Sequence, residues 1–150
     1  SKMIIWGNHS PTMYPDFENM DCNGQSGKDL IEDMDWINGE FLPTVQQRGK
    51  AVIDSRGASS ATSAAKAALD TVVACENPTA SGDCFSAAVM TDGSYGLPDG
   101  IICGMPLRTL ADGTVEIVSG IELSDFAKEK ILISTNELLE ERAAVEELLQ

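Results

Sequence analysis

A short apolar run near the start of the chain is followed at once by residues that stop both strands and helices. Residues 3–6 are all apolar, which is typical of a short buried strand. Gly7 and Asn8 end this run, and two prolines among the following residues keep them out of a helix. The chain must therefore fold with a rigid strand end that opens into a loop, and this loop carries His9, the single histidine of the chain.

A histidine in such a loop is suited to proton transfer, because functional groups are often carried on loops that a rigid scaffold positions. A structural role is nevertheless the commoner one for a loop histidine. A histidine that acts as a general base normally needs a carboxylate to fix its tautomer. Asp16 is near in sequence, but the prolines leave its direction open. The residues alone therefore predict a loop histidine without an identified partner.

Charge and hydropathy exclude several kinds of partner. The chain has 150 residues, enough for one domain with its own core. No apolar run approaches the ~20 residues that a membrane helix needs. A formal net charge of -14 argues against nucleic acid and anionic lipid as partners, since both require clustered Lys and Arg. An anionic ligand would need a few local positive groups.

The four cysteines are widely spaced and form no C-x-x-C pair: Cys22, Cys75, Cys84 and Cys103. We therefore expect reduced thiols in a cytoplasmic compartment, and with one histidine we expect no metal site. The chain also opens almost directly on a buried strand, which is typical of a domain cut from a longer protein.

Two helical patterns follow the histidine loop and an exposed loop at 17–28. The first is predicted from residue 29 to 37, with Asp29 as its cap and the Asn-Gly pair at 38–39 as its end. The second runs from 40 to 55, where Pro43 is acceptable if it lies in the first turn.

A third helix is predicted over residues 61–75, with Ser59 or Ser60 as its cap. Its side chains are almost all small, which lets a helix axis approach its neighbours closely. We therefore expect this helix to lie deep inside the domain.

The second half of the chain changes to strand-like segments. Residues 85–91, 101–107 and 114–118 have this character, and turn formers separate them. The Ala-Asp-Gly turn at 111–113 is typical of a hairpin. Such short connections favour an antiparallel sheet.

A long last helix begins near Ser124. Ile131, Leu138 and Val145 repeat every seven residues along it. Four leucines widen this stripe: Leu132, Leu139, Leu148 and Leu149. Five glutamates are expected on the opposite, solvated face: Glu137, Glu140, Glu141, Glu146 and Glu147. We assign this helix to packing and not to chemistry, and the whole chain to the α+β class, with helices packed on antiparallel sheet.

Several catalytic motifs are absent from the sequence. No G-x-G-x-x-G follows a strand, and neither G-x-x-x-x-G-K-[ST] nor G-x-S-x-G occurs. A Ser–His nucleophile built with Ser10 or Ser59 has no support beyond composition.

Four segments carry a resemblance to a known enzyme family. They are IIWGNHSPTMYPD (4–16), EFLPTVQQRG (40–49), RGASSATSAAKAA (56–68) and SYGLPDG (94–100). Together they resemble the C-terminal half of malate dehydrogenases of the cytosolic type, in the lactate/malate dehydrogenase family. The resemblance implies that residues 1–150 form a single C-terminal catalytic domain and that the N-terminal dinucleotide-binding (Rossmann) domain lies outside them.

The same resemblance implies a site. His9 matches the histidine that takes the proton from the substrate hydroxyl while hydride passes to NAD. Gly49, Ser59 and Ser60 match positions near the substrate pocket, although helix capping explains the two serines equally well. Arg48 matches a residue of helix packing and subunit contact.

The resemblance further implies malate and oxaloacetate as substrates and a homodimer formed partly by the helices between residues 29 and 55. NAD would be bound mainly by the other domain, so these residues alone would be inactive. Two alternatives stay open: a lactate dehydrogenase derived from the malate dehydrogenase branch, and a non-catalytic interaction module that keeps the fold.

Overall fold

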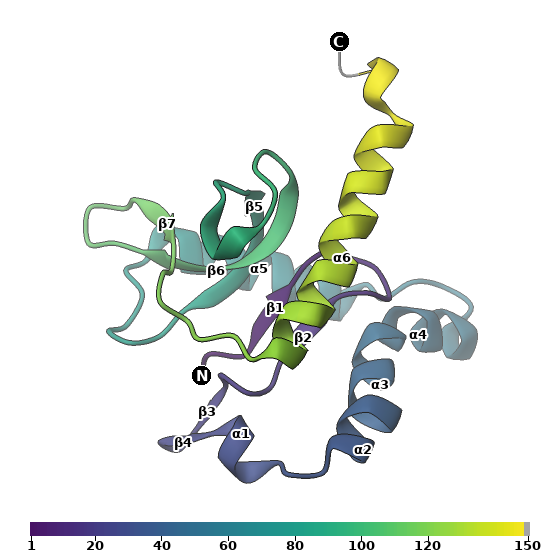
Figure 1. The fold of residues 1–150 in the computed structure, drawn as a ribbon, viewed down its shortest axis with the longest axis horizontal. Helices are drawn as coiled ribbons and strands as arrows, with labels where there is room; N and C mark the ends of the chain where they lie inside the picture. Colours follow the sequence, from purple (N-terminus) through teal and green to yellow (C-terminus); the bar gives the residue numbers. More distant parts are fainter. Residues whose placement is uncertain (149–150) are drawn as a thin grey trace.

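A β-hairpin lies at the centre of the computed structural model, which describes residues 1–148 (Figure 1). Strand β1 (Ile4–Trp6) pairs antiparallel with β2 (Tyr14–Asp16), and the strand predicted at 3–6 is confirmed. Gly7 continues β1 as a bridge to the neighbouring sheet, where its N–H and C=O pair with those of Gly104 at 3.2 and 2.8 Å. The hairpin is therefore joined to the sheet at the point where the histidine loop begins.

The neighbouring sheet has three antiparallel strands in the order β5-β6-β7, as the short connections predicted. They are β5 (Phe85–Met90), β6 (Ile102–Thr109) and β7 (Val115–Ile117). A 3-10 turn, η2 (Ser94–Gly96), lies in the first connection. In the second, the carboxylate of Asp112 accepts a hydrogen bond from the N–H of Thr114 at 2.9 Å.

The segment predicted as an exposed loop has structure of its own. It contains a small hairpin of β3 (Asp21–Cys22) and β4 (Gln25–Ser26), and Phe17 is buried. The short helix α1 (Gly27–Leu30) follows and is capped by the Ser26 hydroxyl, which accepts from the N–H of Asp29. The prediction that Asp29 is the cap was therefore wrong.

The helices between residues 34 and 56 are divided differently from the prediction. Helix α2 (Met34–Trp36) runs through a π-helical turn, η1 (Ile37–Phe41), into α3 (Leu42–Gln46), so the Asn-Gly pair does not end a helix. Pro43 lies in the first turn of α3, as expected, and the wider π turn before it relieves the clash that a proline ring makes with the preceding turn. The chain breaks at Gln47 instead, and α4 (Arg48–Arg56) follows.

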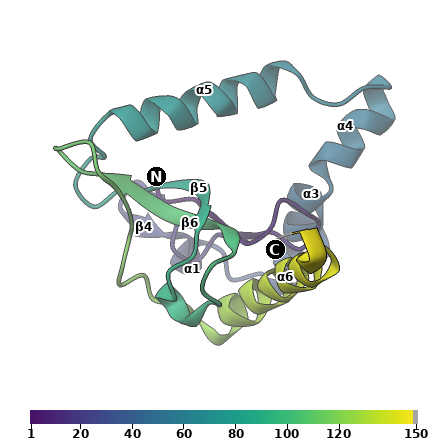
Figure 2. The same ribbon diagram turned by 90° about the horizontal axis from the view of Figure 1, so that it is seen from above.

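Helix α5 (Thr62–Glu76) contradicts the prediction of a buried helix. None of its residues is buried, and Leu69, Val72 and Val73 are 67%, 59% and 59% exposed. Its cap is Ala61, which makes no side-chain cap bond, so the capping role expected of the serines was wrong as well. Figure 2 shows α5 on one side of β5 and β6, with α6 on another. Small side chains permit close packing but do not enforce it, and burial depends on what covers the helix.

Helix α6 (Asp125–Ala144) is the long last helix, and its Ser124 cap accepts from the N–H of Ala127 at 3.0 Å. The predicted stripe is confirmed over the first part: Ile131 is buried and Leu138 and Leu139 pack against the core. Leu132, within that part, is exposed, which the predicted stripe did not foresee. Val145 and Leu148 farther along are exposed as well, and Leu148 ends a 3-10 turn, η3 (Glu146–Leu148). Leu149 lies outside the described residues.

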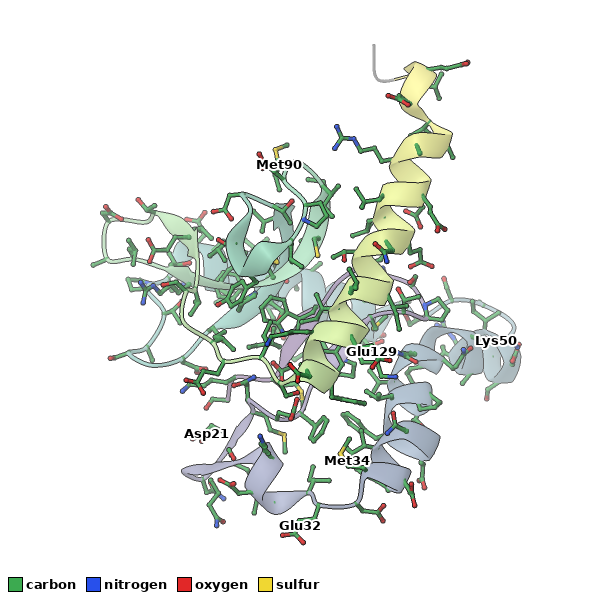
Figure 3. The ribbon with its side chains drawn as sticks, in the orientation of Figure 1. Asp21, Glu32, Met34, Lys50, Met90 and Glu129 are labelled. Carbon is green, nitrogen blue, oxygen red and sulfur yellow. The ribbon has the colours of Figure 1, made fainter. Side chains whose placement is uncertain are left out.

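The core forms where the hairpin, the sheet and α6 meet. Trp6 packs edge-to-face on Tyr95 at 4.9 Å between ring centres, and Phe17 packs in the same way on Phe126 at 6.4 Å. Figure 3 shows the side chains filling this region, whereas the labelled Lys50 and Met90 lie at the surface. The fold is therefore α+β with a long C-terminal helix. Within residues 1–148, no helix is both long and apolar enough to cross a membrane.

Candidate active site

His9 lies on the loop of residues 7–13 that joins β1 to β2, and its side chain is exposed. The strand before it is rigid, because Trp6 is fully buried. The other end of the loop is held by α3, where the amide Nε2 of Gln46 donates to the carbonyl of Met13 at 2.8 Å. The structure thus places the histidine on a loop that is fixed at both ends.

Glu137 of α6 binds the loop on both sides of the histidine. Its Oε2 accepts from Asn8 Nδ2 at 3.0 Å and from Thr12 Oγ1 at 2.7 Å, and the hydroxyl of Ser10 donates to the same oxygen. These hydrogen bonds, with that from Ser10 the strongest influence, lower the pKa of Glu137 below its usual range. The carboxylate is therefore ionised at neutral pH and makes charge-assisted bonds to the loop.

Ser134, one turn earlier on α6, is a second anchor and is fully buried. Its Oγ accepts from the backbone N–H of Asn8 at 2.7 Å and lies 2.9 Å from Oγ1 of Thr12. The loop reaches this hydroxyl because Gly7 has no side chain: a Cβ there would lie 2.2 Å from Ser134 Oγ.

These two anchors were missed by the sequence analysis, which placed Glu137 on a solvated face and gave α6 no chemistry. A signal was present, since Ser134 stands between Ile131 and Leu138 on the apolar stripe. A polar residue on a buried stripe requires a hydrogen-bond partner, and Glu137 lies one turn farther along the same side of the helix.

Asp16 is not the partner of His9. Its carboxylate is buried and accepts from Trp6 Nε1 at 3.2 Å and from the N–H and Nδ2 of Asn19 at 3.1 and 2.9 Å. Burial raises the pKa of this carboxyl, although its hydrogen bonds oppose the shift. Among residues 1–148, no hydrogen bond joins the His9 ring to another side chain, so the ring is open to a group from outside.

The three predicted pocket residues lie on the α4 side of the molecule. Gly49 is in the first turn of α4, and the space where its side chain would project is open. Gly49 comes three residues after Gln46, which donates a hydrogen bond to the histidine loop. Ser59 is exposed and Ser60 is half-buried in the connection from α4 to α5. Within the described part of the chain, no hydrogen bond links either serine to the loop, so their pocket role stays a prediction.

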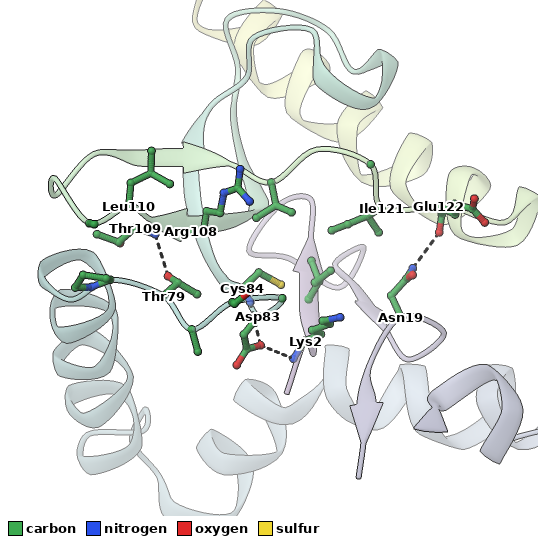
Figure 4. A pocket seen from close by; sticks show the side chains of 18 residues that line it. Lys2, Asn19, Thr79, Asp83, Cys84, Arg108, Thr109, Leu110, Ile121 and Glu122 are labelled. Atoms are coloured by element: carbon green, nitrogen blue, oxygen red, sulfur yellow. Dashed lines mark hydrogen bonds between the residues drawn. The ribbon is translucent and has the colours of Figure 1, made fainter. Parts of the chain in front are cut away.

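A cavity of about 680 Å³ lies elsewhere, between the 78–84 loop, the end of β6 and the segment before α6 (Figure 4). Its charged side chains are of both signs: Lys2, Asp83, Arg108 and Glu122. Burial raises the pKa of the Cys84 thiol in its wall, which disfavours a thiolate nucleophile. None of the predicted site residues lines this cavity, which is separate from the histidine loop.

The lowered pKa of Glu137 predicts a pH dependence of stability. Its folded-state pKa lies below its ordinary value of 4.5, so its hydrogen bonds stabilise the fold fully above that pH and this contribution is lost as the pH falls through the folded-state pKa. We therefore expect the stability advantage of the wild type over Glu137→Gln, measured by urea unfolding, to shrink between about pH 6 and about pH 3. Glu140→Gln, on the exposed side of α6, should show no such change. An advantage that is constant with pH would contradict this assignment.

The fold and this site can be compared with known proteins. The family described as lactate/malate dehydrogenase, alpha/beta C-terminal domain, matches residues 1–149. Malate dehydrogenase from Naegleria fowleri superposes with a TM-score of 0.88 at 41% sequence identity, over 99% of this chain and 45% of that one. The structure of Trichomonas vaginalis lactate dehydrogenase in complex with NADH and oxamate superposes with a TM-score of 0.88 at 26% identity, over 99% of this chain and 46% of that one.

A more distant structure, malate dehydrogenase from Plasmodium falciparum in complex with NADH, shares the fold with a TM-score of 0.79 at 17% identity. It too is matched over 98% of this chain but 48% of its own. The chain thus spans less than half the length of these proteins. The family match over nearly all residues and the 41% identity agree with the histidine loop, the antiparallel sheet and the long last helix. This chain belongs to the lactate/malate dehydrogenase family and has the fold of its alpha/beta C-terminal domain.

Proposed function

We propose that the chain is the catalytic domain of a malate dehydrogenase, which interconverts malate and oxaloacetate with NAD. The observation that carries this proposal is His9: an exposed imidazole on a loop fixed at both ends, in a chain 41% identical to a malate dehydrogenase over 99% of its length. An idle surface loop has no need of such fixing.

In this proposal His9 is the proton acceptor and donor. The neutral imidazole takes the proton from the hydroxyl of malate as the C–H hydride leaves, and the protonated ring returns it when oxaloacetate is reduced. When bound, NAD supplies the acceptor for the hydride. The exposure of His9 fits a coenzyme and substrate that are presented from outside this domain. Gly49, Ser59 and Ser60 are proposed to border the substrate, where small side chains leave room for it.

We propose that a dinucleotide-binding domain completes the site, because the relatives are about twice as long as this chain. It would supply the carboxylate that orients His9 and the arginines that bind the substrate carboxylates. The involvement of Asp16 in the hairpin supports a carboxylate from elsewhere. The 150 residues alone should therefore not turn over substrate.

The test is NADH oxidation by this chain and by the full-length protein. We expect no turnover by the chain alone and turnover of oxaloacetate, in preference to pyruvate, by the full-length protein. Preference for pyruvate would establish the lactate dehydrogenase alternative. The 26% identity to Trichomonas vaginalis lactate dehydrogenase is the observation that favours this alternative. A full-length protein without either activity would refute the proposal in favour of a non-catalytic module.

We also propose a homodimer in the cytoplasm. Large apolar side chains are exposed on the segment between residues 29 and 55, where the interface is expected: Leu30 44%, Met34 39%, Trp36 38% and Ile53 49%. The four cysteines are free thiols, which fits a reducing compartment. Sedimentation should give twice the monomer mass, and Ile53→Glu should shift the protein toward monomer. Wild type that sediments as a monomer at every concentration would contradict the dimer.

A further inference from the structure

We propose that Glu137 is a positioning residue for His9, and that its carboxylate fastens the neighbours of the histidine to helix α6. This inference rests on the proposed function, since it assigns a role in turnover to a residue that lies outside the loop.

The geometry joins three loop residues to one atom. Asn8 and Ser10, the immediate neighbours of His9, and Thr12 all donate to Oε2 of Glu137. The histidine ring makes no hydrogen bond of its own within residues 1–148, so its neighbours set its position. This carboxylate oxygen therefore joins both neighbours of the imidazole to α6. On the Asn8 side it acts together with Ser134 Oγ, which accepts from the N–H, and with Glu141 Oε1, which accepts from Nδ2 at 2.8 Å.

The hydroxyl protons of this cluster are directed toward the carboxylate of Glu137. Thr12 has one hydroxyl proton, which goes to the carboxylate, so the Ser134 hydroxyl donates in the 2.9 Å contact with Thr12. Ser134 Oγ in turn accepts from the N–H of Asn8, and Ser10 Oγ accepts from the N–H of Thr12 at 3.0 Å. The loop therefore donates three hydrogen bonds to Oε2, and an ionised carboxylate oxygen accepts such bonds more strongly than a neutral oxygen does. The amide oxygen of a glutamine can accept the same bonds, but each is weaker without the charge.

Glu137 is the residue of α6 that holds Ser10, on the other side of the histidine from Asn8. His9 and Pro11 are exposed, so apolar burial contributes little there. Other hydrogen bonds that hold the loop within residues 1–148 are those of Ser134 and Glu141 to Asn8 and Thr12, the turn bond from Met13 N–H to the Ser10 carbonyl, the Gly7 bridge and the bond from Gln46 to Met13. A proton-transfer group that is misplaced by about 1 Å can lose about 100-fold in rate. Loss of the Glu137 bonds should therefore reduce catalysis even where the fold survives.

The test uses the full-length enzyme and two of its variants, Glu137→Gln and Glu140→Gln. Each variant removes one negative charge from helix α6. Glu140 is exposed on α6, and the structure shows no hydrogen bond from it to the loop. We expect Glu137→Gln to lower kcat about 10- to 100-fold, with KM for NADH and oxaloacetate within about twofold of wild type. The primary isotope effect with 4-deuterated NADH should rise, because the chemical step becomes rate-limiting. Glu140→Gln should match wild type in all of these.

Two outcomes separate this inference from the proposed function. Inactive wild type refutes the proposed function and with it any role in turnover. Active wild type with Glu137→Gln indistinguishable from Glu140→Gln overturns the positioning role alone. If Glu137→Gln does not fold, Ser10→Ala and Thr12→Val each remove one donor to the same oxygen. We expect each to lower kcat about 2- to 10-fold, and normal kcat in both would overturn the inference.

Discussion

Under the proposed function, replacing His9 by Gln in the full-length protein is expected to lower kcat for oxaloacetate reduction about 100- to 10,000-fold, because an amide cannot exchange a proton with the substrate oxygen. Gln has a similar reach and can still hydrogen-bond, so the loss reports proton transfer and not a void. The exposed imidazole makes no hydrogen bond within the described chain, so we expect the melting temperature and the NADH dissociation constant to stay near wild type. Stopped-flow kinetics, calorimetry and coenzyme fluorescence measure these three quantities.

A matched surface change is available on α4. Lys50 is exposed and, among residues 1–148, pairs with Asp54 alone, one turn farther along the same helix, so Lys50→Gln should leave kcat unchanged. If His9→Gln retained kcat within about threefold of Lys50→Gln, the imidazole would not be the proton carrier.

The local parts of this molecule could be predicted from the sequence. The apolar run at 3–6, the turn formers around the second-half strands and the Ser-Asp start of the last helix each encode their structure within a few residues. His9 could be found for the same reason, since strand end, loop and histidine are contiguous in the chain.

What failed depended on contacts between distant residues. The Asn-Gly pair at 38–39 is a poor helix former, yet Ile37 and Leu42 on either side are buried and hold the helix through it. Helix α5 was expected to be buried because of its small residues, but the hydrogen bond that ties it, from Thr109 Oγ1 to the carbonyl of Ala74 at 2.7 Å, is at its C-terminal end. Neither outcome follows from local propensity.

The candidate site divides in the same way. The histidine proposed as its proton carrier is encoded locally, but the contact from Ser10 to Glu137 spans 127 residues, and no pattern within either segment specifies it. Only the heptad position of Ser134 hinted that the last helix has a polar partner. Functional loops of this kind can be recognised from the sequence, whereas the residues that hold them require the tertiary structure.

Replacing Gly7 by Ala destabilises the domain by about 2–5 kcal/mol, which is the largest stability effect we expect. Two causes add. Gly7 has a φ of +94°, where an L side chain is strained, and its Cβ would lie 2.2 Å from Oγ and 2.5 Å from Cβ of Ser134. Because Ser134 is fully buried on α6, relief requires the helix and the histidine loop to separate. Urea unfolding monitored by tryptophan fluorescence measures the change.

The substitution Gly24→Ala separates the backbone strain from the steric clash. Gly24 has a φ of +85°, but nothing lies within 4 Å of the position of its Cβ, so Gly24→Ala carries the backbone strain without the clash and should cost about 1–2 kcal/mol. The excess in Gly7→Ala is then the steric cost. In a Ser134→Gly background this excess should largely vanish, since the nearest remaining atom, the Cα of residue 134, is 3.9 Å away. Equal losses for the two alanine variants, or an excess that persists without the serine, would mean that the loop and α6 are not in the close contact through which Glu137 holds the histidine.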